Sequence, residues 1–535
     1  MLATSAIAFI ATTMLSIHCP AEVWLEILSH LPRTTLLSTC MLSKYFLDLS
    51  LDLLYEEITL DSSDKMARER LQMVIRDKNV ADRVRRLTIL PPLSEGRSNP
   101  TSSSRQIRFL NYLCHLEDLR RNFAGLSCFP SQQIECHLNV STSGLPICLT
   151  NVQEVTITLS SFYQNQNFCN FYKYMWEKNC IGPNIRKFSV STPALDLAFL
   201  IMPMLRYGSA ILKNLTHVRL DLGRSYNPTK GNKNQVWGSL TKLVNLAGSS
   251  LTSLSFSSSD PNIDRGANLS SLPFLQSLQK LEYHCPFYVS SLADMTALTE
   301  FIGKYSTQLS HLVIAPFSTR VWDEDDGHPA GESYSKWITS TDSRGIDLSP
   351  QIGLSSLVLP ALRYLAIRPA GRMSRRNILP DLRQFAPGLK SLRISGPLPQ
   401  ALIYSILNFL SSDSDGGYQL EKLAIQVKNL SPDLFDNLYT KLPHLKHLEI
   451  KFSALSSSNS EGPEGGILRT DGVPESTTPR KYAHWSLQYL RIAPMAECQG
   501  RHPDMALMKT VGNWISDDII LDAEKRCQCD DKLGC

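Results

Sequence analysis

The sequence predicts an α/β protein in which short parallel strands alternate with helices. A phrase close to Leu-x-x-Leu-x-Ile returns along most of the chain, as at residues 251–256, 362–367 and 445–450. The last apolar pair of each copy alternates with a polar residue, which is typical of a strand with one buried face. Amphipathic stretches such as residues 402–410 lie between the copies and favour helices. Because each unit is too small to bury its apolar side alone, we expect neighbouring units to stack.

The copies define a register when the second leucine, or its replacement, is taken as a marker. Most steps are about 25 to 36 residues, compared with roughly 20–29 in regular leucine-rich repeats. The Asn or Cys of the regular repeat is mostly missing, so we interpret the repeats as irregular, with a possible extra copy at residues 354–359. The predicted markers are Leu87, Leu119, Val155, Phe188, Val218, Leu254, Leu281, Leu312, Leu365, Leu392, Leu423, Leu448 and Leu490.

The residues on either side of the marker point away from the core, and in a stacked array they line up as a concave face. Tyr and Arg often anchor protein interfaces, so we predict a target-binding surface near the C-terminal end of this face. The alternative is a solvated strand face without a ligand. The predicted target-binding residues are Tyr364, Arg393, Lys422, His447, Tyr489 and Arg491.

Composition favours a large chain with ample core and without nucleic-acid affinity. Of the 535 residues, 43% are hydrophobic, and the formal net charge is only +4. The arginine clusters at residues 83–86, 120–121 and 372–376 are interpreted as solvated charge, because a nucleic-acid binder carries a stronger basic footprint. No catalytic pattern such as Gly-x-Ser-x-Gly, a phosphate loop or His-Glu-x-x-His is present, so we expect no enzyme and no cofactor.

The thirteen cysteines follow no disulfide framework, which indicates reduced thiols in the cytoplasm or nucleus. Cys527, Cys529 and Cys535 lie in the tail, downstream of Cys498 and His502, but they supply only one end of a zinc site, so we predict a loose tail without metal. Residues 1–16 are apolar but lack the basic start of a signal peptide, and no stretch reaches the roughly 18–20 apolar residues that span a bilayer. We therefore expect no membrane association.

Residues 17–60 predict a compact helical module. Pro20 suits a helix start, Glu22 suits the first turn, and Val23 and Ile27 share a helical stripe. Pro32 ends this helix, a second helix follows with Thr34 or Thr35 as its cap, and a third holds Phe46 and Leu49. A module of this size cannot bury all its leucines, so part of its apolar surface should meet a partner or the repeats.

This segment resembles an F-box, and the repeats beyond it are similar to those of F-box proteins that carry leucine-rich repeats. Cys19 departs from the family pattern, which usually has Leu before the first Pro, and this weakens one expected apolar contact. The resemblance covers residues 17–60 closely and most of the remaining chain loosely. Residues that match the family pattern are Pro20, Glu22, Val23, Ile27, Leu28, Leu31, Pro32, Thr35 and Leu36.

The resemblance implies a substrate-recognition subunit of a cullin-RING (SCF-type) ubiquitin ligase, with a horseshoe solenoid after the F-box. It implies that a Skp-type adaptor binds the module, while an unknown target protein binds the concave face. The alternatives are an interaction scaffold whose helical module only caps the repeats, and a hydrolase hidden among them. The implied adaptor-binding residues are Pro20, Glu22, Val23, Ile27, Leu28, Leu31, Pro32 and Leu36.

The predicted domain organisation has four parts. An extension (1–16) precedes the module (17–60), the repeats occupy 61–496, and a cap and tail form 497–535. Two insertions at 321–345 and 453–480 are rich in Ser, Gly, Pro and acidic residues, and we expect loops there. In the last part, Trp514, Ile515 and the apolar run at 519–521 should cap the final repeat.

Overall fold

The computed structural model describes residues 20–60, 77–90, 149, 151–159, 172–173, 176, 183–207, 209–223, 233–259, 269, 272–285, 292–316, 337–338, 353–368, 382–411, 420–455, 482, 485–494 and 520–523. The strands follow one another in the order of the chain, from β1 to β14. By its contacts the chain forms two compact units, residues 1–254 with 272–277 and residues 255–271 with 278–535. The division falls within β6 (Ser253–Ser258).

The first unit begins with three helices, α2 (Ala21–Ser29), α3 (Arg33–Thr39) and α4 (Lys44–Tyr55). Pro20 precedes α2 and Glu22 lies in its first turn, as the sequence predicts. Ser43 caps α4, because its hydroxyl accepts a hydrogen bond from the amide of Phe46 at 3.2 Å. The predicted threonine cap of α3 is wrong: the helix starts at Arg33 directly after Pro32, without a side-chain cap.

A small apolar core joins these three helices. It contains Leu28, Leu36, Phe46, Leu49 and Leu54, all less than 9% exposed. Trp24 packs edge-on against Phe46 with ring centroids 5.0 Å apart. Thr39 donates to the carbonyl of Leu36, and a 2.8 Å hydrogen bond joins its hydroxyl to that of Ser50 on α4. The buried polar pair is therefore satisfied inside the module.

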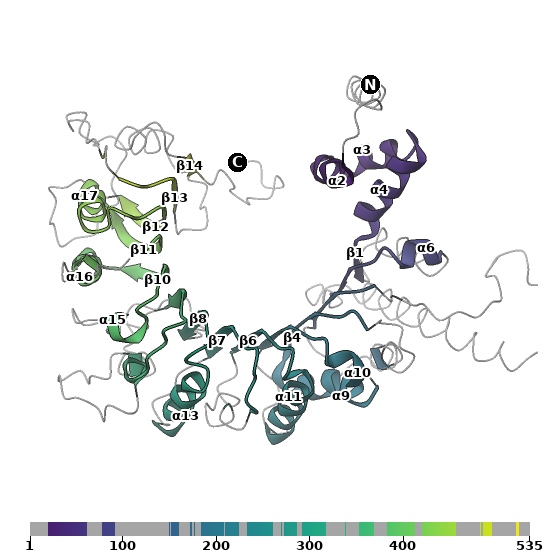
Figure 1. The fold of residues 1–535 in the computed structure, drawn as a ribbon, viewed down its shortest axis with the longest axis horizontal. Helices are drawn as coiled ribbons and strands as arrows, with labels where there is room; N and C mark the ends of the chain where they lie inside the picture. Colours follow the sequence, from purple (N-terminus) through teal and green to yellow (C-terminus); the bar gives the residue numbers. More distant parts are fainter. Residues whose placement is uncertain are drawn as a thin grey trace, which may run out of the picture. The chain divides into compact units, whose positions relative to one another are not determined.

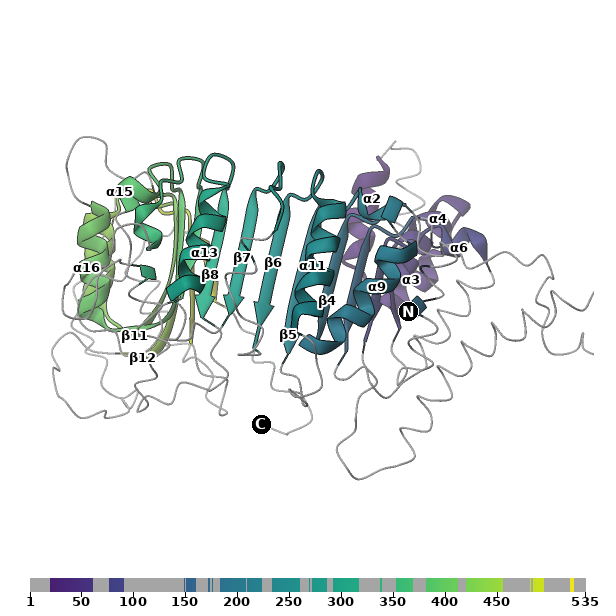
Figure 2. The same ribbon diagram turned by 90° about the horizontal axis from the view of Figure 1, so that it is seen from below.

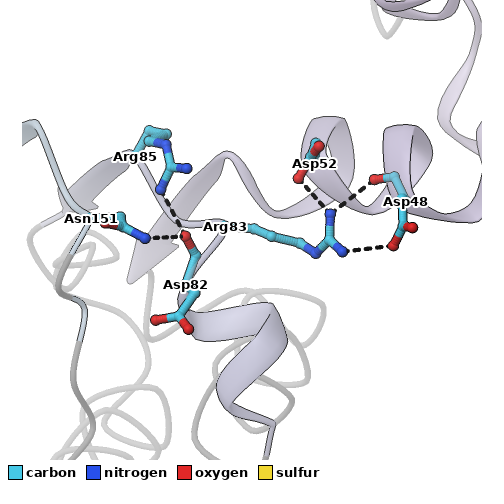
Figure 3. Close-up of polar contacts among 6 residues, drawn as sticks. All are labelled: Asp48, Asp52, Asp82, Arg83, Arg85 and Asn151. Atoms are coloured by element: carbon cyan, nitrogen blue, oxygen red, sulfur yellow. Dashed lines mark hydrogen bonds and ion pairs between the residues drawn. The ribbon is translucent and has the colours of Figure 1, made fainter. Parts of the chain in front are cut away.

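Arg83 holds helix α4 against the start of the sheet (Figure 3). Its guanidinium donates to the Asp48 carbonyl at 3.0 Å and to the Asp48 carboxylate at 2.9 Å, and it pairs with Asp52 at 2.5 Å. The Arg83 side chain is only 19% exposed. The prediction that this arginine cluster is simply solvated is thus wrong at Arg83, because its charge is used inside the molecule.

Parallel strands follow, and in this unit they pair residue for residue. Ile58 of β1 aligns with Leu87 of β2, Leu87 with Val155, Val155 with Phe188, and Phe188 with Val218. The further elements are β1 (Glu57–Leu60), α6 (Lys78–Ala81), β2 (Arg86–Ile89), β3 (Glu154–Thr158), β4 (Lys187–Pro193), η1 (Ala194–Asp196), α9 (Leu197–Tyr207), α10 (Ser209–Leu212), β5 (His217–Gly223) and α11 (Lys233–Ala247).

The second unit repeats the same pairing. Leu281, Leu312, Leu365, Leu392, Leu423, Leu448 and Leu490 align from strand to strand, and each is buried. Its elements are β7 (Lys280–Cys285), α13 (Leu292–Gly303), β8 (His311–Pro316), η2 (Leu354–Ser356), β9 (Tyr364–Ile367), α15 (Leu382–Phe385), β10 (Ser391–Leu398), α16 (Gln400–Ser411), β11 (Lys422–Leu430), α17 (Pro432–Lys441), β12 (His447–Leu455), β13 (Tyr489–Pro494) and β14 (Ile520–Ala523).

In each unit the helices that connect successive strands lie on one side of the sheet. Helices α9 and α11 cover one side of β4 and β5 in the first unit, and α16 and α17 do so for β10–β12 in the second (Figures 1 and 2). Buried strand residues alternate with partly exposed ones, as in β11. We call the side carrying the partly exposed residues the open face of each unit.

Three details of the predicted register change. Leu119 lies outside the described residues. Because β2 pairs directly with β3, the prediction of a further strand between them in the sheet is wrong. The possible copy at residues 354–359 forms no strand: it begins with the short 3-10 helix η2 (Leu354–Ser356), and β8 pairs directly with β9. The predicted C-terminal cap instead extends the sheet, because Leu521 of β14 aligns with Leu490. Trp514 and Ile515 lie outside the described residues.

Buried aromatic residues lie within the first predicted insertion and just after the second. Trp337, within the first, is 1% exposed, and its indole donates to the Thr299 hydroxyl of α13 at 2.9 Å. After the second insertion, the Tyr482 hydroxyl donates to Asp436 of α17 at 2.8 Å, and its ring lies 5.7 Å from that of Trp485. Trp337 therefore packs in the core, although we expect a loop in this insertion from its composition.

Candidate interaction surfaces

The helical module leaves large apolar side chains in solvent. Val23 and Ile27 share a stripe on α2, and each is 45% exposed. Most of the large exposed apolar residues in the described part of the chain belong to this module, which is unusual for so short a segment. We call this set the module's apolar surface: Val23, Ile27, Leu37, Met41, Leu42, Tyr45 and Leu47.

The structure separates the predicted adaptor-binding residues into two groups. Pro20, Glu22, Val23, Ile27 and Pro32 are exposed, and Leu31 is half-buried. In contrast, Leu28 and Leu36 lie in the core of the module, at 2% and 7% exposure. These two leucines hold the helices together. The accessible apolar area comes from Val23 and Ile27 and from neighbours outside the predicted set, such as Leu37 and Met41. Leu37 lies on α3, whereas Met41 follows the end of that helix, so a helical pattern alone does not group these two residues.

On the open face of the first unit, oppositely charged residues are neighbours. The first row aligns Glu57, Arg86, Glu154, Lys187 and His217 across β1–β5. Arg86 pairs with Glu57 at 3.8 Å and with Glu56 at 3.1 Å, and Lys187 forms an ion pair with Glu154. The second row is mostly hydroxyl-bearing: Thr59, Thr88, Thr156, Ser189 and then Arg219.

The second unit brings the predicted target-binding residues together on its open face. The first row aligns Tyr364, Ser391, Lys422, His447 and Tyr489 on successive strands. The second row aligns Ala366, Arg393, Ala424, Glu449 and Arg491. All six predicted residues thus fall in two adjacent rows over β9–β13, in the register that the sequence predicts.

Two histidine–tyrosine pairs recur along the first row. The His311 ring stacks on Tyr364 with centroids 5.6 Å apart, and the His447 ring lies 5.9 Å from that of Tyr489. Partial burial lowers the pKa of both histidines, and nearby lysines add to the effect, Lys280 at His311 and Lys422 at His447. Both imidazoles are therefore neutral near pH 7.

Carboxylates on this face are engaged by cations or hydroxyls. Burial opposes ionisation of Glu282, but hydrogen bonds from Lys280 and Ser255 outweigh it and lower its pKa. Glu449 pairs with Arg491 at 3.9 Å. At the strand starts, a hydrogen bond from Lys390 lowers the pKa of Glu421. Glu282 and Glu421 are thus held ionised, and the carboxylates of this face balance only some of the cations.

No family model and no curated protein matches this chain. Within the ranges that the structure describes, no helix is both long and apolar enough to cross a membrane. The same ranges contain no group of three or more His, Cys, Asp or Glu side chains placed to hold a metal ion. Cys498, His502, Cys527, Cys529 and Cys535 lie outside these ranges.

Proposed function

We propose that the chain is a substrate-recognition subunit of a cullin-RING (SCF-type) ubiquitin ligase. Its helical module, α2–α4, binds a Skp-type adaptor, and its open sheet face receives a target protein. It has no catalytic chemistry of its own, and the assembly accelerates ubiquitin transfer by holding target and enzyme together. We infer further that the repeat region is an irregular leucine-rich-repeat solenoid, for which the in-register parallel strands in each unit are the support.

The module's apolar surface is the observation that carries this proposal. A helical module that merely capped a repeat array would turn its apolar side inward and present a polar outer side. Here Val23, Ile27, Leu37 and Met41 stay exposed while a separate core holds the helices together. Together with the F-box-like spacing from Pro20 to Leu36, this arrangement favours a docking module over a simple cap.

Co-purification with a Skp-type adaptor tests the proposal. We expect Val23→Asp with Ile27→Asp to abolish adaptor retention. Each side chain is 45% exposed, so its burial contributes roughly half of the about 1.5–3 kcal/mol of a fully buried one, and each Asp adds the cost of burying a charge. Together these changes should weaken the complex by about a hundredfold or more, at about 1.4 kcal/mol per tenfold. Retention would be measured by size-exclusion chromatography of the co-expressed proteins.

The matched control is Phe199→Asp with Met202→Asp on α9. These two side chains are 46% and 45% exposed, close to the 45% of Val23 and Ile27, but they lie outside the module. The control variant should retain the adaptor, and circular dichroism should show that both variants fold. If the folded Val23/Ile27 variant keeps the adaptor as the wild type does, the module's apolar surface is not the docking site. If the wild type itself retains no adaptor, the chain is a scaffold outside the ligase.

A further inference from the structure

The open face of β10–β13 carries more positive than negative charge. The first three open-face positions of each of these strands carry four cationic side chains, Arg393, Lys422, Lys451 and Arg491, and one carboxylate, Glu449. Both imidazole-bearing positions nearby are neutral near pH 7, so they do not change this balance. On the open face of the first unit, by contrast, Glu57, Glu154 and Asp221 offset three cations.

Arg393 and Lys422 lack ion-pair partners among the described residues, although other cations close by have them. Lys390, one residue before β10, pairs with Glu421 at 3.0 Å. The register explains the difference for Arg393: it lies beside Ala424, and Glu449 lies one strand further on, where Arg491 engages it. One strand spacing is about 4.8 Å, so Arg393 is two spacings from the nearest carboxylate of its row.

Ala424 forms a low floor between these two cations. Lys422 precedes it by two residues on the same side of β11, and Arg393 faces it from β10. Ser391 lies opposite Lys422 and adds a hydroxyl to the same neighbourhood. An anionic group above Ala424 can therefore receive hydrogen bonds from a guanidinium, an ammonium and a hydroxyl, and such charge-assisted bonds are the strong ones.

We propose that this site binds an anionic side chain, a phosphate or a carboxylate, on an extended segment of the target protein. The segment runs across the strands, with its anionic group over Ala424 between Arg393 and Lys422. The rings of His447 and Tyr489 continue the row and offer apolar contact beside it. This inference rests on one part of the proposed function, the binding of a target protein to the open face, and does not depend on adaptor binding.

The charge distribution favours a protein segment over a nucleic acid. A polyanion needs a long basic tract, whereas this chain carries a formal net charge of only +4 and the cationic site spans a few strands. The aromatic rings nearby are engaged in His–Tyr pairs and do not form a row of free platforms for bases. A single anionic side chain matches the size of the site.

The test uses the full chain and three pools of degenerate, fluorescently tagged peptides that differ only at a fixed central residue. This residue is phosphoserine, glutamate or serine, and fluorescence anisotropy measures binding. We expect the phosphoserine or the glutamate pool to bind and the serine pool to bind at least about tenfold more weakly, since hydrogen bonds to charged groups contribute about 1.5–3 kcal/mol. Comparing the two anionic pools tells phosphate from carboxylate.

Two variants locate the binding. Arg393→Gln with Lys422→Gln should weaken the anionic pool by about tenfold or more. Ala424→Glu should do the same, because it places a carboxylate on the floor without touching the buried side of β11. The matched control, Arg86→Gln with Lys187→Gln, removes the same charges from the open face of the first unit, and it should bind as the wild type does.

Equal binding of the three pools would overturn the proposal, as would wild-type binding by both site variants. Binding of poly(U) RNA that is as tight as peptide binding, and is lost in the same variants, would also overturn it. Adaptor retention measured on the same proteins keeps the two proposals apart: a chain that binds anionic peptides but no adaptor contradicts only the ligase assignment.

Discussion

The two units share a buried design but differ on their open faces. In both, one apolar residue per strand aligns across the sheet and is buried, as at Phe188 and Leu423. On the open faces, the first unit pairs Lys187 with Glu154 and has one row made mostly of hydroxyl-bearing residues, whereas the second leaves Lys422 and Arg393 without ion-pair partners in the described ranges. The difference teaches that packing specifies the repeat, while the open positions are free to differ in chemistry.

The largest effects should come from the shared buried positions. Phe188→Ala in the first unit and Leu423→Ala in the second should each lower the free energy of unfolding, by about 3–5 and 2–5 kcal/mol, because each leaves a cavity in a packed core. Urea denaturation measures both. A small loss in one unit and a large one in the other would mean that the two units are not built alike.

A smaller loss in the free energy of unfolding is expected from a substitution at Gly396, in the second unit. Its φ is 130°, a region that side chains rarely adopt, and it lies where the register between β10 and β11 shifts. Its amide donates to the Gln426 side chain at 2.5 Å. Gly396→Ala should cost about 1–3 kcal/mol in thermal denaturation. Gly238→Ala, on helix α11 with no heavy atom within 4 Å of the added carbon, is the control and should not destabilise the chain.

Removing one open-face lysine from each unit gives a sharper comparison with still smaller effects. Lys187→Gln breaks an exposed ion pair and should cost about 0–1 kcal/mol. Lys422→Gln breaks none among the described residues, so the free energy of unfolding should stay the same or rise slightly. Equal destabilisation by both substitutions in urea titrations would contradict the charge contrast between the two faces.

The smallest effect concerns the two histidines of the second unit. Because their folded-state pKa values lie below the ordinary 6.5, the unfolded chain binds more protons as the pH falls through that value. The free energy of unfolding should therefore fall as the pH is lowered below about 6.5. Lys422 and Lys446 lower the pKa of His447 and Glu421 opposes them, while burial is the largest cause.

Histidine titration by NMR can isolate the lysine contribution. In Lys422→Gln the pKa of His447 should rise part of the way toward its ordinary value, while that of His311, which faces Lys280, should not change. An unchanged His447 titration would show that Lys422 does not lie close to the imidazole in solution.

Much of the strand register could be predicted from sequence, because each copy must place a buried apolar residue beside those of the two neighbouring strands. Markers from Val155 to Leu490 fall on paired strands, whereas the additional strand predicted between β2 and β3 is excluded because these two strands pair directly. Leu28 and Leu36 were predicted as contact residues, but which side of a short helix turns inward depends on neighbours such as Phe46, far along the chain. For the same reason Arg83, whose acidic partners lie more than thirty residues earlier, could not be recognised.

The contacts of Arg83 have a mechanical consequence for the first unit. One planar guanidinium holds two positions of α4, one turn apart, so rotation of that helix about its junction with β1 would break several charge-assisted bonds together. A protein docked on α2 and α3 would therefore keep a fixed angle to strands β1 and β2. Arg83→Met would let the angle between the helical module and strands β1 and β2 vary, while leaving the docking surface itself intact.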